Sequence, residues 1–247
     1  MFRAMTTDAA AQPPVKDISA AAVLILCAVL YLALMGVLFF VDPDLIKGEM
    51  GLMENGQNLF LLVSLILMIR LAIMADTPKL RWWMILASLG AFYLLTEETS
   101  WGQHYFGWEA TGIFAGINDQ GETNFHNSGD GWLDQKPRAI LLFGMILGTI
   151  VHPLVKHFRK GRGLFDNPWW LAPTLVCLPP LVFSQIGALP ERIDDLALMD
   201  FSVQAFTSNY RSSEMEEFFM YLFFVTYTLS ITTRFQQRKA AGIRPAS

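Results

Sequence analysis

Charged residues are scarce in this 247-residue chain. Only 16% of its residues are Asp, Glu, Lys or Arg, whereas 53% are hydrophobic and the mean hydropathy is +0.37. Soluble domains usually carry about 25% charged residues, and the charges here stand in short blocks between long apolar runs. This distribution argues against a soluble α/β protein and indicates a polytopic membrane protein.

Cysteine is almost absent as well. Cys27 and Cys177 both lie in the middle of apolar runs. This excludes a disulfide framework and a cysteine-based zinc site, which need exposed or closely spaced cysteines. A cleavable signal peptide is not evident either, because the uncharged run 18–41 is too long for a signal-peptide core. We expect this run to remain as a membrane span.

Six apolar segments can cross a hydrocarbon core of about 30 Å, which takes about 20 helical residues. The sequence therefore predicts an all-α transmembrane bundle. The expected spans are 18–41, 55–75, 82–98, 139–157, 169–189 and 217–234, and the outer loops are 42–54, 99–137 and 190–215. Pro173, Pro179 and Pro180 predict a kink in the fifth span. We expect one membrane domain at 18–235, between a disordered cytoplasmic tail at 1–17 and a second cytoplasmic tail at 236–247.

The basic residues predict the orientation. If the N-terminus lies inside and the spans alternate, 13 of the 18 Lys and Arg residues lie inside and 18 of the 22 acidic residues lie outside. This follows the positive-inside rule and predicts both termini in the cytoplasm. We expect a multi-pass protein of the bacterial inner membrane with its main loops in the periplasm. The acidic outer face argues against nucleic acid as a partner, whereas membrane lipids are expected partners.

Several carboxylates are expected at the outer membrane boundary. Glu97 stands only ~24 Å above Arg81 on a helix, so Glu97 and Glu98 should lie at or just below that boundary. Glu54 and Glu217 are expected at the same depth, and Glu214 one helical turn above Glu217. Such groups need a proton, an arginine partner or a cation.

The loop after the third span adds imidazole groups to these acids. His104 would share a helical face with Glu97 if the helix continued past Glu98, and Glu122 and His126 stand at i and i+4. The predicted catalytic residues are Glu97, Glu98, Glu122, His126, Glu214 and Glu217. Glu98, Glu122, His126 and Glu217 are the predicted metal ligands, because carboxylates with imidazole suit Zn, Mn or Fe. Trp101, Gln103, Asn118 and Gln120 are the predicted substrate-binding residues. The alternative is a polar network that attaches this loop to the bundle.

Other chemistry has less support in the sequence. There is no H-E-x-x-H motif, no EF-hand and no paired Glu-x-x-His motif, and neither Ser100 nor Ser184 lies in a G-x-S-x-G elbow. Glu98 and Glu217 could act as an acid–base pair. The aromatic residues Trp101, Tyr105, Phe106, Trp108 and Trp132 could hold a lipid or sugar, or form an interfacial belt. His152 and His157 are expected at the inner interface without a role.

One pattern carries a resemblance to a known group. Glu97-Glu98-x-Ser100-Trp101-Gly102-Gln103, followed by Asn118-x-Gln120-x-Glu122-x-x-x-His126-Asn127, resembles the pattern of a group of uncharacterised bacterial polytopic membrane proteins. The likeness extends from about Glu54 to Glu217. It implies which residues to examine and gives no mechanism.

The leading hypothesis is an enzyme or binding site for a lipid or lipid-linked substrate at the outer membrane boundary. In one form of this hypothesis, the site also binds a divalent metal. The alternative is a non-catalytic subunit of a larger membrane complex, such as a photosynthetic or respiratory assembly. An ion or proton pathway is less favoured, because no charge is expected near the midplane of any span.

Overall fold

The computed structural model describes residues 16–46, 51–118, 121–125, 132–160, 164, 172–199, 201–203 and 210–242, without the side chains of 117 and 132–137. The main helices are α1 (Ala20–Phe40), α2 (Leu52–Met74), α3 (Pro78–Glu98), α6 (Trp132–Ile146), α7 (His152–Phe158), α8 (Leu178–Asp195) and α10 (Ser212–Ala240). The short elements are η1 (Pro43–Leu45), η2 (Ser100–Gly102), α4 (Gln103–Phe106), α5 (Phe114–Ile117), the π-helical turn η3 (Leu147–Val151) and η4 (Leu175–Cys177). Every regular element of these residues is helical, which confirms the all-α prediction.

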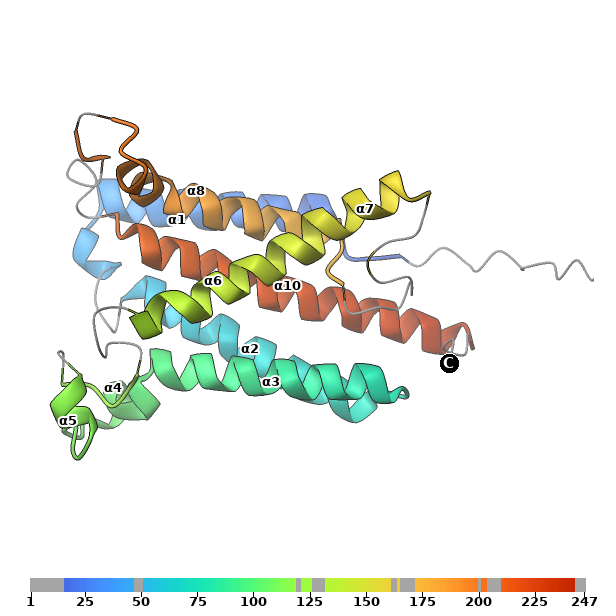
Figure 1. Cartoon of the computed structure of the whole chain (residues 1–247), viewed down its shortest axis with the longest axis horizontal. Coiled ribbons are helices and arrows are strands. Elements are labelled where there is room, and N and C mark those ends of the chain that lie inside the picture. Colours follow the sequence, from blue (N-terminus) through green and yellow to red (C-terminus); the bar gives the residue numbers. More distant parts are fainter. Residues whose placement is uncertain are drawn as a thin grey trace, which may run out of the picture.

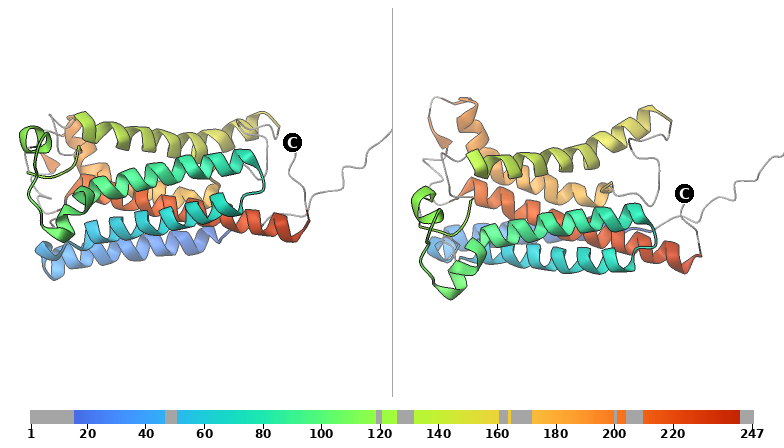
Figure 2. Two further views of the ribbon diagram at one scale, coloured as in Figure 1. Left: turned by 90° about the horizontal axis from the view of Figure 1, so that it is seen from below. Right: turned by 60° about the horizontal axis from the view of Figure 1, so that its bottom comes forward.

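Helix α10 lies in the middle of the bundle (Figure 1). It packs along α8 on one side and α2 on the other, α3 packs on α2, and α1 packs on α8. All nine residues from Met215 to Phe223 are buried, so this part of α10 has no exposed face. A helix buried on every side is a core helix. The other helices surround it, and α6 touches it over a short stretch only (Figure 2).

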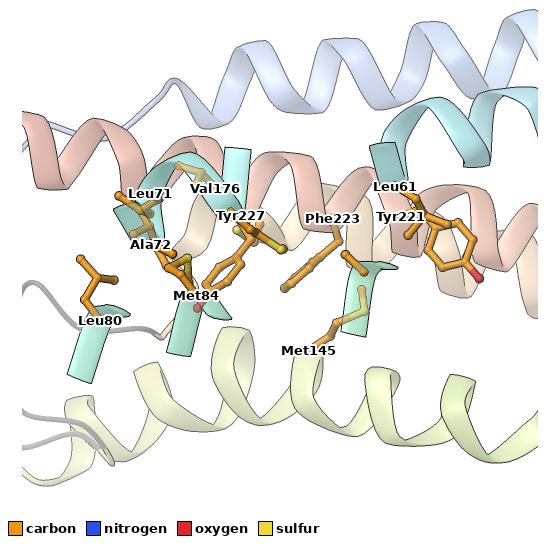
Figure 3. Close-up of a cluster of buried hydrophobic side chains, with 14 of the residues drawn as sticks. Leu61, Leu71, Ala72, Leu80, Met84, Met145, Val176, Tyr221, Phe223 and Tyr227 are labelled. Atoms are coloured by element: carbon orange, nitrogen blue, oxygen red, sulfur yellow. The ribbon is translucent and has the colours of Figure 1, made fainter. Parts of the chain in front are cut away.

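Two clusters of apolar side chains fill the spaces around α10. One joins α2, α3, α8 and α10, and includes Leu61, Met84, Phe223 and Tyr227 (Figure 3). The other joins α1, the start of α2, and α10, with Phe183 of α8 packed against it. The hydroxyl of Tyr227 accepts a hydrogen bond of 2.7 Å from the indole of Trp83. This bond pairs two polar groups of the core with each other, as a buried position requires.

Three helical segments of the described chain are long and apolar enough to cross a membrane. They are α1, α2 and the stretch Arg138–Phe158, which runs through α6, η3 and α7. They coincide with the first, second and fourth predicted spans. Helices α3, α8 and α10 lie at the other predicted spans but do not reach the same apolar composition. The structure therefore supports a membrane protein.

The fifth predicted span needs a correction. It was expected at 169–189 with a kink at its prolines, but α8 begins at Leu178 and continues to Asp195, through Pro190. Pro179 and Pro180 stand in the first turn of α8, where a proline costs no hydrogen bond. These two prolines begin the helix and do not interrupt it.

The two ends of the described chain meet at one end of the bundle. The backbone N–H of Lys16 donates to the side-chain oxygen of Gln237 (2.8 Å), and the Gln237 amide donates to the Lys16 carbonyl (2.7 Å). Asp17, predicted to belong to a disordered tail, accepts hydrogen bonds from Thr174 (2.6 Å) and Ser230 (2.9 Å). We call this the basic end. The opposite, acidic end is where α3 ends and α10 begins, on the left of Figure 1.

Candidate functional site

The backbone turns sharply where α3 ends. Ser100, Trp101 and Gly102 all have positive φ, at 46°, 57° and 99°. The helix of α3 therefore does not continue past Glu98, and the condition for a shared helical face of Glu97 and His104 is not met. A non-glycine residue in this conformation costs roughly 1–2 kcal/mol, so the hydrogen bonds around the turn must offset that cost.

Ser100 is the centre of a buried hydrogen-bond network. Its hydroxyl lies 2.8 Å from Nε2 of His104, donates to Oε2 of Glu122 (3.1 Å) and accepts from Nδ2 of Asn124 (2.8 Å). Asn124 also donates to the same Glu122 oxygen (2.7 Å). Asn118 accepts from the Glu122 backbone N–H (3.0 Å) and donates to Oδ1 of Asn124 (2.8 Å). We call these five residues the loop network.

The loop network differs from a catalytic triad in two respects. In a Ser-His-acid triad, the serine and the acid contact different nitrogens of the imidazole. Here Nε2 of His104 contacts both Ser100 and Oε1 of Glu122, the latter at 3.3 Å. Ser100 is also fully shielded from solvent. This geometry favours a structural role for Ser100 over a nucleophilic one.

Other predicted site residues attach the loop to α3 in the same way. Glu97 accepts hydrogen bonds from the indole of Trp101 (2.9 Å) and from the backbone N–H of Phe125 (2.7 Å). Gln103 accepts from the backbone N–H of Thr123 (2.6 Å). These partners lie just after α3 and in the segment 121–125. The contacts agree with the alternative hypothesis, a polar network that attaches the loop to the bundle.

Two of the predicted residues, Gln120 and His126, lie outside the described residues, as does the side chain of Trp132. Their predicted roles stay predictions.

A second group of charged residues gathers at the start of α10. Glu216 is 1% exposed, and its carboxylate accepts hydrogen bonds from Gln185 (3.0 Å) and Arg192 (3.3 Å) of α8. Arg138 of α6 lies 3.9 Å from Glu216 and 3.3 Å from Glu217. One buried carboxylate thus connects the three helices α6, α8 and α10.

Three further acids of this end, Glu54, Glu98 and Glu214, also have partners. Tyr221 of α10 donates a hydrogen bond of 2.6 Å to Glu98, at the last residue of α3. Arg211 lies 2.8 Å from Glu214 and 3.8 Å from Glu54 of α2. The sequence argument expected the acids of the second, third and sixth spans to meet at one level, and the structure brings them together at the acidic end. Arginine and tyrosine side chains make this possible by pairing with individual carboxylates.

A cleft of about 650 Å³ opens between α6, α8 and α10 beside Glu216. Its polar lining consists of Arg138, Glu191, Arg192, Asp195, Ser213 and Glu216. Its apolar lining consists of Ala139, Leu142, Phe143 and Ile146, all on α6. A volume of this size is typical of small-molecule sites, so the cleft can hold an amphiphilic molecule.

The described residues do not form the predicted metal site. In the part of the chain that the structure describes, no three His, Cys, Asp or Glu side chains are grouped to hold a metal ion. Glu98 contacts Tyr221, Glu217 contacts Arg138, and Glu122 belongs to the loop network. Each of these three carboxylates thus contacts a side chain that is not a predicted ligand.

Sequence reasoning missed several residues of this end. The orientation argument counts Arg138 and Arg192 only among the five basic residues expected outside, and it does not include Tyr221 or Gln185. The available signal is the position of each arginine in the sequence, next to a predicted span on the side where most acidic residues are expected. Which acid each one contacts depends on how the helices are rotated, and the sequence does not specify that rotation.

Comparison of the chain with protein-family models, curated proteins and solved structures gives no match. The resemblance to a group of bacterial membrane proteins therefore stays a prediction.

Proposed function

We propose that this protein binds a phospholipid, or a lipid-linked substrate with a similar head group, in the cleft between α6, α8 and α10. The observation that carries the proposal is the cleft itself, about 650 Å³ in volume, which combines ion-paired polar groups with an apolar wall. Lipids have the same division into a polar head and an apolar tail.

The proposal places the cleft at the periplasmic boundary of a bacterial inner membrane. In this arrangement all six long helical segments cross the membrane, and both termini lie in the cytoplasm. The support is that Lys16 and Gln237 are hydrogen-bonded to each other at one end of the bundle. An even number of crossings likewise places both ends of a chain on the same side of the membrane. The scarcity of Lys and Arg in the loops of the other end agrees with the positive-inside rule.

The order of residues along α6 matches the order of groups in a lipid. Arg138 stands at the acidic end, and Leu142 and Ile146 follow it at steps of four, so the three share one face of the helix. Phe143, which is 67% exposed, lies beside them. A head group at Arg138 would have its acyl chains along Leu142, Phe143 and Ile146, towards the membrane interior.

The charges in the cleft indicate the kind of head group. Arg192 keeps 45% of its side chain exposed while it contacts Glu216, so it retains donors for a phosphate, which arginine binds well. The cleft also contains three carboxylates, from Glu191, Asp195 and Glu216, against two guanidinium groups. This surplus of negative charge favours a zwitterionic head group with an ammonium, such as ethanolamine, over an anionic one.

The test is lipid binding by purified protein, measured by native mass spectrometry with phosphatidylethanolamine and phosphatidylglycerol. Arg192→Gln should weaken phosphatidylethanolamine binding about 10-fold or more, because a hydrogen bond to a charged group contributes about 1.5–3 kcal/mol. Arg211→Gln is the matched control, since Arg211 lies at the same end but pairs with Glu54 and Glu214, outside the cleft. Equal binding by the wild type and both variants would contradict the proposal.

The alternative function is a subunit of a larger membrane complex. The exposed apolar side chains of α1 favour it, among them Ile25 (62%), Leu32 (67%) and Phe40 (88%), because a partner helix could pack there as well as lipid. A protein that co-purifies in fixed ratio and blocks lipid binding would favour this alternative over the lipid site.

A further inference from the structure

The segment that follows α3 has its polar groups inside and its apolar groups outside. Ser100, Asn118, Glu122 and Asn124 of the loop network are buried. Glu109 and Thr111 of the same segment are exposed, but its other exposed large side chains are apolar: Trp101 (45%), Tyr105 (52%), Phe106 (80%), Trp108 (41%), Ile113 (74%) and Phe125 (41%). We call these six residues the aromatic face. A loop surrounded by water has the opposite arrangement.

Charge is nearly absent from this segment. Between Thr99 and Asn118, Glu109 is the one Asp, Glu, Lys or Arg residue in the sequence. A surface that binds an acidic or basic protein partner needs a matching set of charges. The aromatic face instead has the composition of a membrane interface, where Trp and Tyr rings lie at the level of the lipid head groups.

The aromatic face continues an exposed face of α3. Leu86 (62%), Leu89 (60%) and Phe92 (47%) are exposed along that helix. The ring of Trp101 packs edge-on against Phe92, with centroids 6.4 Å apart. If α3 crosses the bilayer, its exposed apolar side chains face lipid, and Trp101 extends that surface beyond the end of the helix.

Contacts within the segment hold two rings of the aromatic face, those of Phe106 and Trp108, in place. The rings of Phe106 and Trp108 stack with centroids 5.9 Å apart, and Trp108 donates a hydrogen bond to Thr123 (3.2 Å). Gly102 lies against both rings, because a Cβ at this residue would come within 3.3 Å of each. Preorganised side chains lose little conformational entropy when they enter a membrane.

We infer that the aromatic face lies in the head-group region of the outer leaflet and contacts phospholipid there. Apolar surfaces of this kind enter the boundary between head groups and acyl chains by about 5–10 Å. The segment would then act as a fixed anchor beside α3, and the loop network would keep its polar groups away from lipid. This inference depends on the membrane placement of the bundle and not on lipid binding in the cleft.

The test uses an environment-sensitive fluorophore on a single introduced cysteine. Cys27 and Cys177 are both fully buried, so a maleimide dye should react with an exposed Ile113→Cys and not with the wild type. The labelled protein is placed in nanodiscs that contain phospholipid with a nitroxide near the top of the acyl chain. Asp44→Cys is the matched control, because Asp44 is an exposed charged residue in η1 at the same end.

The Ile113 label should emit at shorter wavelength than the Asp44 label and lose most of its emission to the nitroxide lipid. Tyr105→Cys, at a second position of the aromatic face, should behave like Ile113→Cys. Labels at Ile113 and Tyr105 that emit as in water, or that are shielded from water but not quenched by the nitroxide, would overturn the inference. The second of these results would identify a protein surface as the partner. A cleft that binds no lipid would leave these expected results unchanged.

Discussion

At the residue scale, Ser100 shows how much of the acidic end depends on buried hydrogen bonds. Its hydroxyl contacts His104, Glu122 and Asn124 within 3.1 Å. Its backbone has a positive φ, a conformation that is unfavourable for serine. Buried polar groups that lose a partner cost more than the hydrogen bond itself contributes. The loop network should therefore be sensitive to single substitutions.

Ser100→Ala should lower the free energy of unfolding by about 1–3 kcal/mol, because it leaves buried polar groups without a partner. The measurement is thermal unfolding in detergent, together with lipid binding in the cleft. Thr96→Ala is the control, since the Thr96 hydroxyl bonds only to carbonyls of its own helix in the described structure. If Ser100 were a nucleophile, Ser100→Ala would keep its stability and lose activity on a lipid substrate. That result would contradict the structural role.

The sequence predicted which residue types gather at the acidic end, but it did not predict their pairs. Depth along each span follows from counting residues, so the level of Glu54, Glu98 and Glu214 could be predicted. The contacts of Glu98 with Tyr221 and of Glu122 with Ser100 could not. The contact of Glu98 depends on the rotation of α10 about its axis. The contact of Glu122 depends on three successive residues with positive φ, and only one of them, Gly102, is a glycine.

At the element scale, the approach of α8 to α10 determines the position of Glu216. Gly187 makes this approach possible, because a Cβ there would lie 2.8 Å from Cγ of Met215 and 3.1 Å from the backbone nitrogen of Glu216. Small residues at helix interfaces allow such contacts in membrane proteins. The pairing of Glu216 with Gln185 and Arg192 depends on the same close packing.

Gly187→Ala should therefore destabilise the protein by about 1–3 kcal/mol, because the added methyl group forces the two backbones apart. Gly36→Ala is the matched control, since a Cβ at Gly36 of α1 meets no atom within 4 Å. The control should be neutral or slightly stabilising, because alanine favours a helix more than glycine by about 1 kcal/mol. Thermal unfolding of both variants measures the difference. Equal melting temperatures would show that the two helices have room to separate.

Helix positions could be predicted from apolar runs, whereas the ends of the fifth and sixth segments could not. The observed α2 (Leu52–Met74) and α3 (Pro78–Glu98) overlap the predicted 55–75 and 82–98 closely. The predicted start of the fifth span was wrong because a proline pair such as Pro179-Pro180 is compatible with two structures. It can kink a helix from within, or it can stand in the first turn of a helix. The sixth predicted span ends at residue 234, because the apolar run ends there. Helix α10 continues through the charged residues that follow and ends at Ala240.

At the scale of the whole molecule, the arrangement of the ends predicts a testable topology. Reporter domains fused after Lys79 and after Arg162 should report the cytoplasm, and one fused at Gly129 should report the periplasm. The reason is that, with six alternating spans, most Lys and Arg residues lie at the same end of the bundle as the two termini. The positive-inside rule assigns that end to the cytoplasm. A cytoplasmic signal at Gly129 would contradict the orientation.

The central claim, that the cleft binds phospholipid, can be tested most directly by photo-crosslinking in native membranes. A benzophenone amino acid replaces Phe143 in the cleft, or Phe158 at the other end of the same helical stretch, where 78% of the side chain is exposed. We expect adducts at Phe143 to be enriched in phosphatidylethanolamine relative to the bulk membrane and to lose that enrichment with Arg192→Gln, whereas adducts at Phe158 follow the bulk composition. Adducts at Phe143 that match the bulk lipids with or without Arg192, or that consist of another protein, would contradict the claim.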